Sequence, residues 1–369
     1  MKTADSERIL GLDMLRAIAI LMVLGRHIYA PPADLQVVPA ILIRTWFEIG
    51  WAGVDLFFVL SGFLVSGLLF KEHALTGSIN IKRFLIRRGF KIYPAFYALL
   101  LISIGYYRSR GETVPLMHIL TESFFLQNYT RGVWWHTWSL AVEEHYYFLL
   151  AFTVYLSLAH ARNKAEPFAA LPKILLAIGA GCLTLRIVTA WLLPFHESTH
   201  LFPTHLRIDS LMAGTFVAYA MHLAPQHFQR LKQRRRLLLA VMALASGALL
   251  AIPLQIPIMY TLGYSVLYMG SGALLIFAPW EGWSVRMRQM LEPLAFIGRH
   301  SYSIYLWHVP AKGWLVPALQ NHFQWPLSYG ECVGTYLFLS VGIGVAMSYA
   351  IETPFLKLRE RLVPSRQRR

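Results

Sequence analysis

A nearly unbroken apolar run close to the N-terminus, from Leu10 to Tyr29, constrains this chain more than any other feature. Its length matches the roughly 20 residues that a helix needs to cross a bilayer core. Arg16 and His27 interrupt the run, eleven residues apart. At about 3.6 residues per turn, both side chains lie on one helix face, roughly 16 Å apart along the axis. A lone buried cation or imidazole can simply tie helices together. Two on one face favour function, because charge at membrane depth is costly outside a polar cavity.

The composition extends this interpretation to the whole chain. Of its 369 residues 56% are hydrophobic and only 14% are charged, and the mean hydropathy is +0.47. A soluble domain is nearer to about a quarter charged. The two cysteines, Cys182 and Cys332, stand in apolar segments and give neither a metal-binding pattern nor a promising disulfide. We therefore expect a polytopic membrane protein with no metal and no permanently bound cofactor.

Hydropathy predicts an all-α bundle of about ten transmembrane helices. The expected spans are 9–29, 50–70, 90–108, 139–159, 173–193, 206–223, 237–253, 257–278, 294–312 and 330–351. The first span lacks an Ala-x-Ala-like cleavage site, which favours a retained helix over a signal peptide. The basic stretches 230–236 and 357–369 fall on the cytoplasmic side only if both termini are cytoplasmic. We expect a membrane domain over 1–354 and a basic cytoplasmic tail over 355–369. The net charge of +15 then reflects topology and contact with membrane lipids, not nucleic-acid binding.

This topology predicts two layers of polar side chains. Acidic and imidazole groups gather near the outer ends of the spans, and cations gather near the inner ends. The outer layer would hold His27, Asp55, Glu143, Glu144, Arg207, Asp209 and His308. The inner layer would hold Arg16, the basic cluster 82–88, Lys91 and Arg299, with Glu352 among them.

The inner cluster has the chemistry of a phosphate site. Arg83 and Arg87 are four residues apart, so they share a helix face, and Arg88 follows directly. Guanidinium forks bind phosphate oxygens well, so a phosphorylated cytosolic cofactor could dock here. The same basic residues would also be expected if this segment were only the positively charged cytoplasmic flank of a membrane helix.

In the outer layer, residues 136–148 contain the adjacent carboxylates Glu143 and Glu144. Adjacent side chains point in different directions on a helix. One could orient His27, and the other could pair with Arg207 or face the outer surface. A histidine supported by a carboxylate suits proton removal from a hydroxyl, since its reference pKa is about 6.5. The alternative is a buried ion-pair network that only fixes helix packing.

Seven motifs in this order give a strong resemblance to a known family. They are LDMLRAIAILMVLGRH (12–27), GVDLFFVLSGFLVSGLL (53–69), RFLIRRGFKIYP (83–94), TWSLAVEEHYYF (137–148), RIDSLMAG (207–214), FIGRHSYSIYLWH (296–308) and IETP (351–354). The chain resembles the acyltransferase-3 family of integral membrane acyltransferases over nearly its whole length. Some members carry an SGNH hydrolase-like domain after the membrane part, which we do not expect within the 15 or so residues that follow Pro354.

The resemblance implies roles for particular residues. It places Arg16 and His27 in catalysis and associates Arg83, Arg87 and Arg88 with the acyl donor. Its Trp-Ser-Leu-x-x-Glu element maps onto Trp138, Ser139, Leu140 and Glu143. Further candidate site residues stand in the same motifs and near the outer ends of the spans: Asp55, Ser61, Glu144, Arg207, Asp209, Tyr302 and His308.

The resemblance also implies an O-acetyltransferase of the bacterial inner membrane that moves acetyl from cytosolic acetyl-CoA. The acceptor would be a hydroxyl of an exported or surface glycan, such as an exopolysaccharide, an O-antigen or a lipid-linked sugar. We expect His27 to remove the hydroxyl proton with Glu143 orienting the ring, while Arg16 holds the donor arm or stabilises the oxyanion. Direct transfer and an acetyl-His27 intermediate both remain open. So do an acyltransferase acting on a small molecule such as an antibiotic, and a transporter or flippase without acyl chemistry.

Overall fold

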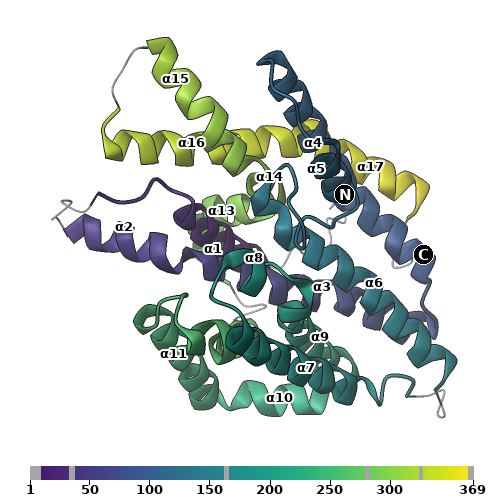
Figure 1. The fold of residues 1–369 in the computed structure, drawn as a ribbon. Coiled ribbons are helices and arrows are strands. Elements are labelled where there is room, and N and C mark those ends of the chain that lie inside the picture. Colours follow the sequence, from purple (N-terminus) through teal and green to yellow (C-terminus); the bar gives the residue numbers. More distant parts are fainter. Residues whose placement is uncertain (1–9, 33–37, 162–165, 279–282, 324–326, 365–369) are drawn as a thin grey trace. The chain divides into compact units, whose positions relative to one another are not determined.

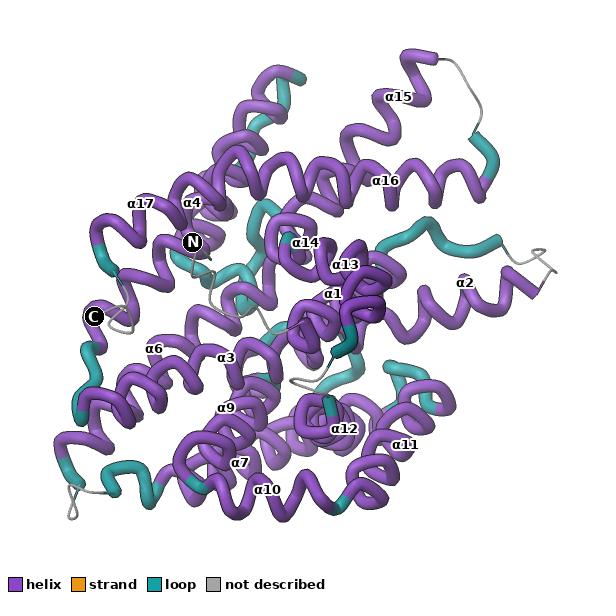
Figure 2. The backbone as a smooth tube through the Cα atoms, turned by 180° about the vertical axis from the view of Figure 1, so that it is seen from behind, coloured by secondary structure: helices purple, strands orange, loops and turns teal. Residues whose placement is uncertain are grey.

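Helices and the loops between them make up the backbone of this protein (Figures 1 and 2). The computed structural model describes residues 10–32, 38–161, 166–278, 283–323 and 327–364. No strand occurs in those ranges. The predicted all-α class is therefore confirmed.

Several helices have the length and apolarity of membrane spans. Five among the described residues satisfy both requirements: Ile41–Thr76, Ile81–Ser109, Leu171–Leu192, Met259–Phe277 and Tyr329–Leu362. The first helix, α1 (Leu10–Arg26), is apolar but has only 17 residues. The number of ten spans stays a prediction, as do the positions of the termini.

The chain divides into two compact units, and the first joins its N-terminal part to residues 277–353. α1 packs closely against α13 there, and α14 against α16; α15 and α16 form a helical hairpin (Figure 1). The elements of this first unit are α1, α2 (Val38–Ile49), η1 (Gly50–Ala52), the start of α3 (Gly53–Thr76), α13 (Val285–Arg299), α14 (Ser301–Pro310), the π-helical turn η5 (Ala311–Leu315), α15 (Val316–Phe323), α16 (Tyr329–Met347) and the π-helical turn η6 (Ser348–Glu352).

The second unit comprises residues 58–276 together with 354–369. Here α7 packs against α9, and α4 packs against α6. Besides the rest of α3, its elements are α4 (Ile81–Ser109), α5 (Leu116–Ser123), η2 (Trp135–Thr137), α6 (Trp138–Ala159), α7 (Leu171–Leu192), α8 (Glu197–His200), η3 (Thr204–Leu206), α9 (Ile208–Leu223), α10 (Pro225–Gln233), α11 (Arg235–Ala251), the π-helical turn η4 (Met259–Gly263), α12 (Tyr264–Phe277) and α17 (Thr353–Leu362).

Glycines allow the closest helix contacts in both units. A Cβ on Gly298 of α13 would stand 1.8 Å from the backbone oxygen of Asp13 in α1. A Cβ on Gly214 of α9 would stand 2.0 Å from the backbone oxygen of Val59 in α3. Neither backbone could approach so closely with a side chain in between, which is the usual role of small residues between membrane helices.

Two predicted spans differ clearly from the helices of the structure. The span expected over 294–312 is broken at His300, where α13 ends and α14 begins. The span expected from residue 90 starts at Ile81, because Asn80 caps α4 by accepting a hydrogen bond from the backbone N–H of Arg83. The basic tail begins as the helix α17, and residues 365–369 of that tail lie outside the described residues.

Candidate active site

His27 lies in the turn that directly follows α1. Its backbone N–H donates to the carbonyl of Leu24 at 3.1 Å, so the last helical turn tightens before the chain leaves the helix. Pro31 and Pro32 follow, and proline disfavours helix in the residue before it. The predicted span 9–29 therefore ends three residues early. His27 is left half-buried at the helix end.

A second histidine, His308 of α14, contacts His27. The Nε2 atom of His308 is 3.0 Å from the Nδ1 atom of His27, and the ring centroids are 4.8 Å apart. His308 is fully buried, which favours its neutral form, and its Nδ1 lies 2.6 Å from the carbonyl oxygen of Tyr305.

These contacts set the direction of the hydrogen bonds. A carbonyl only accepts, so Nδ1 of His308 carries a proton and donates to Tyr305. In a neutral His308, Nε2 must then accept, and Nδ1 of His27 donates to it. The Nε2 atom of a neutral His27 then carries no proton and is an acceptor, as a general base requires.

A lysine that sequence reasoning missed stands beside this pair. Nζ of Lys312 donates to the carbonyl of Ile28 at 3.1 Å and lies 4.7 Å from the ring centroid of Tyr29. Tyr329 also fixes the turn, since its hydroxyl donates to the carbonyl of Tyr29 at 3.1 Å. In the sequence, Lys312 could have been recognised as a candidate because it is a charged residue inside an otherwise apolar segment. It occupies the π-helical turn η5, a feature often found at functional sites.

Arg16 has a partner one turn away on α1. Its Nη1 is 3.1 Å from Oδ1 of Asp13, an acidic residue that the sequence analysis passed over. The side chain of Asp13 is only 6% exposed, whereas that of Arg16 is 35% exposed. The guanidinium is therefore oriented by a buried carboxylate and keeps part of its surface open.

The remaining first-unit candidates are buried or half-buried. Asp55 stands in the first turn of α3 with 1% exposure, and Tyr302 is half-buried on α14. Next to Tyr302, Ser303 donates to the buried Glu352 at 2.8 Å. Glu352 also accepts from Ser348 at 3.3 Å. The motifs at 296–308 and 351–354 thus meet in a buried hydrogen-bonded network.

In the second unit, the arginine cluster lines a pocket of about 250 Å³. Arg83 pairs with Glu72 at 3.0 Å, and Arg87 pairs with Glu360 of α17 at 2.7 Å. The structure thus places the three predicted arginines around one pocket. The lining residues are Leu68, Leu69, Glu72, Leu75, Thr76, Arg83, Phe84, Arg87, Arg88 and Arg359. Arg359 was not predicted as a site residue, because the basic tail was interpreted as charge that sets the membrane topology.

Glu143 and Glu144 lie close to this cluster, not a layer above it. Glu144 accepts a hydrogen bond from the hydroxyl of Tyr93 at 3.0 Å, and Glu143 accepts one from Tyr147 at 3.0 Å. The guanidinium of Arg88 is 6.0 Å from the ring centroid of Tyr147 and interacts electrostatically with both carboxylates. The predicted separation of outer carboxylates from inner cations was therefore wrong here. The long connection 110–137 places the start of α6 beside the middle of α4, which hydropathy could not reveal.

Ser61 joins the same network, since its Oγ is 2.9 Å from the hydroxyl of Tyr147. Glu143 and His27 belong to different compact units, so the orienting role predicted for Glu143 stays a prediction. At Nδ1 of His27 the structure places His308.

The last candidates form a buried cationic group around α9. Asp209 pairs with Arg186 of α7 through both oxygens, at 2.7 and 3.2 Å, and Arg186 was not predicted. Arg207 is fully buried, and its guanidinium lies 3.9 Å from the ring centroid of Tyr264 and 5.8 Å from that of Trp138. Ser139, beside Trp138 at the start of α6, is also buried.

A family model described as the acyltransferase domain matches residues 9–351. The chain belongs to the acyltransferase-3 family. The expected resemblance is confirmed, and the acyltransferase-3 chain is an integral membrane protein with several long apolar helices. Except for Glu352 and the side chains of α17, all of the paired side chains described above fall within the matched range.

Among similar proteins are two O-acetyltransferases. The peptidoglycan O-acetyltransferase OatA of Listeria monocytogenes is 25% identical over 340 residues, which cover 84% of this chain and 50% of that protein. The O-acetyltransferase OatA of Staphylococcus aureus is 24% identical over 330 residues, covering 81% of this chain and 50% of that protein. The acyltransferase-3 chain thus spans about half the length of these relatives. No solved structure matches it.

Proposed function

We propose that this protein is a multi-pass O-acetyltransferase of the bacterial inner membrane. It moves acetyl from cytosolic acetyl-CoA to a hydroxyl of an exported or surface glycan. Family membership and the two O-acetyltransferase relatives support the transfer chemistry. The name of the Listeria relative supports a glycan acceptor.

The observation that carries the proposal is the histidine pair. With Nδ1 of His27 donating to His308, Nε2 of His27 is the proton acceptor. It takes the proton of the acceptor hydroxyl as the hydroxyl oxygen attacks the thioester carbonyl. The carbon–sulfur bond breaks, and the CoA thiolate takes the proton from the imidazolium. Lys312 lies beside this site, where its positive charge stabilises a developing oxyanion.

The arginine pocket supports the choice of donor. Guanidinium groups are the usual ligands of phosphate, and the phosphates of CoA are its most highly charged part. The pocket of about 250 Å³ is smaller than the roughly 300–1,000 Å³ usual for a whole drug-sized ligand. It suits the phosphate-bearing end of the donor, with the pantetheine arm outside it.

Mass analysis of surface glycans tests the function. We expect acetyl esters on a surface glycan of cells that carry the protein and their loss in cells without it. Complementation with His27→Ala should not restore them, whereas complementation with the exposed control variant His322→Ala should. Membrane fractions must contain both variants in equal amounts. Full acetylation by His27→Ala would rule out this mechanism.

A cell-free assay separates glycan from small-molecule acceptors. Membranes supplied with labelled acetyl-CoA should transfer label to a polymeric or lipid-linked sugar. Label found only in a soluble, diffusible product would reject the glycan acceptor and leave the acyltransfer itself standing.

A further inference from the structure

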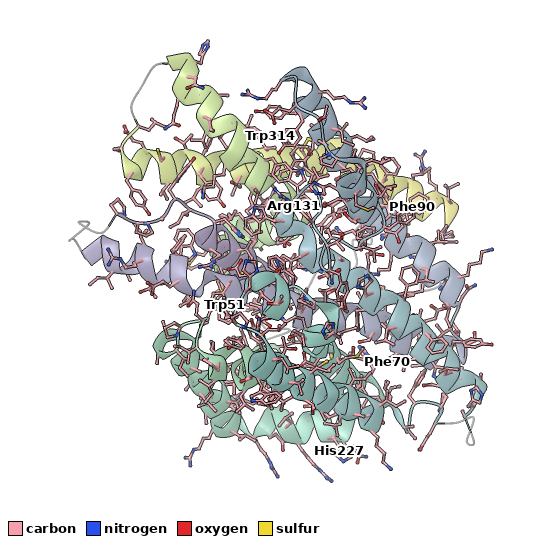
Figure 3. The ribbon with its side chains drawn as sticks, viewed as in Figure 1. Trp51, Phe70, Phe90, Arg131, His227 and Trp314 are labelled. Atoms are coloured by element: carbon pink, nitrogen blue, oxygen red, sulfur yellow. The ribbon has the colours of Figure 1, made fainter. Side chains whose placement is uncertain are left out.

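The C-terminal helix α17 packs against α4, and Figures 1 and 2 both show the two helices side by side. Phe355 of α17 lines an open apolar groove of about 460 Å³ together with residues of α4 that include Phe90, labelled in Figure 3. One turn further along α17, Arg359 lines the arginine pocket. The helix thus lies along α4 at two successive sites. The interpretation of the tail as surface charge alone does not explain this.

Glu360 bridges two guanidinium groups with one oxygen. Its Oε1 lies 2.7 Å from Nη2 of Arg87 and 2.8 Å from Nη2 of Arg359. Arg87 also donates to the backbone carbonyl of Val363, the residue that follows α17. A single anionic oxygen shared by two arginines is the arrangement that a phosphate oxygen adopts in an arginine site.

Arg359 retains unused binding capacity. Its Nε–H is buried and has no hydrogen-bond partner in the described part of the chain. A buried donor of this kind costs free energy unless a partner is supplied. The lining of this pocket carries four guanidinium groups, those of Arg83, Arg87, Arg88 and Arg359, and one carboxylate, that of Glu72. Outside the lining, Glu360 pairs with Arg87 and Arg359, and Glu143 and Glu144 interact electrostatically with Arg88. Guanidinium groups thus outnumber carboxylates on the lining of the pocket itself, which favours an anion there.

We propose that Arg359 is a fourth phosphate-binding arginine of the donor pocket. Glu360 occupies the position of a donor phosphate on Arg87 and Arg359 until the donor binds. This inference rests on the proposed function, because it takes the ligand to be an acyl-CoA. Donor binding then exchanges one anion for another on the same guanidinium groups, and it releases Glu360 into solvent. The carboxylate keeps the cluster from repelling itself when the pocket is empty, and it weakens the binding of competing small anions.

Binding of CoA to the purified full-length protein in lipid nanodiscs tests the proposal, since CoA without an acyl group does not turn over. We expect Arg359→Gln to weaken CoA binding about tenfold, the usual range for one charge-assisted contact. Glu360→Gln should tighten it several-fold, because the competing anion is gone. Arg361→Gln removes an exposed charge from the same helix and should change nothing. Arg359→Lys keeps the charge without the fork, and its affinity should lie between that of the native protein and Arg359→Gln.

Binding of CoA fragments shows which part of CoA the Arg359→Gln substitution affects. Adenosine 3′,5′-bisphosphate should show the same weakening with Arg359→Gln, whereas pantetheine, which has no phosphate, should not. In turnover assays Arg359→Gln should raise the KM for acetyl-CoA with little change in kcat. A loss caused by misfolding would instead lower the yield of folded protein and the binding of both fragments.

The outcomes separate this proposal from the proposed function. CoA binding that is equal in Arg359→Gln and Arg361→Gln would overturn the role of Arg359 while leaving the acetyltransferase intact. Weaker binding by Glu360→Gln would overturn the role of Glu360 as an occupant. Absence of CoA binding in the native protein would overturn the acyl-CoA donor, and this proposal with it.

Discussion

The histidine pair and the arginine pocket use polar groups in opposite ways. Around His27 the contacts form a directed chain of neutral hydrogen bonds from one ring to the next and on to a backbone carbonyl. Around Arg87 the contacts are salt bridges between ionised side chains, in which carboxylates partly neutralise the guanidinium groups. A directed neutral chain fixes where a proton sits, and the guanidinium groups on a pocket lining fix where an anion sits. The first arrangement suits catalysis and the second suits binding.

The largest effect should come from breaking the histidine chain at its buried end. His308→Ala leaves Nδ1 of His27 without its acceptor, so the reactive tautomer is no longer selected. We expect kcat to fall about 100-fold, in the range of a lost general base, while the KM for acetyl-CoA changes less than about twofold. Steady-state kinetics of the purified protein measures both values.

Rescue distinguishes a positioning role from a packing role. In His308→Gln, a side-chain carbonyl can still accept from His27, so part of kcat should return. The exposed variant His322→Ala is the control. Equal losses in His308→Ala and His308→Gln, or a loss confined to KM, would contradict the tautomer argument.

A smaller effect, on binding alone, should follow from breaking the arginine pocket. Arg87→Gln combined with Arg88→Gln removes two guanidinium groups from the pocket wall. We expect the KM for acetyl-CoA to rise roughly 10- to 100-fold while kcat stays within a few-fold, because hydrogen bonds to charged groups contribute about 1.5–3 kcal/mol. Lys82→Gln, an exposed charge on the same helix, serves as the control. If donor dependence in the double variant matches that of Lys82→Gln, these arginines do not bind the donor.

The smallest effect should be a difference in salt dependence. Raising the salt concentration from about 0.05 to 0.3 M shortens the screening length and weakens attraction between the pocket and the phosphates. We expect the KM for acetyl-CoA to rise about two- to fivefold. The kcat should stay nearly constant, because the histidine chain carries no net charge. Parallel kinetic series in sodium chloride measure this, and a fall in kcat with constant KM would reverse the assignment of the two regions.

Sequence reasoning succeeded where the signal is local. The motif order gave the family, the apolar runs gave the membrane helices, and the spacing of Arg83 and Arg87 gave a shared helix face that the pocket bears out. Sequence reasoning failed where the depth of a side chain in the membrane had to be inferred from the predicted ends of the spans. Glu143 and Arg88 were assigned to different layers, yet they interact electrostatically across α6 and α4.

The sequence by itself determined that this chain forms apolar membrane helices, that it belongs to the acyltransferase-3 family, and which residue types could carry its chemistry. Helical period and hydropathy are properties of neighbouring residues, so they can be read directly. Only the tertiary structure decided the partners. His308 meets His27 from 281 residues along the chain, and Glu360 meets Arg87 from 273 residues along it. Contacts at such separations depend on how helices pack, and no local pattern encodes which buried side chains then face each other.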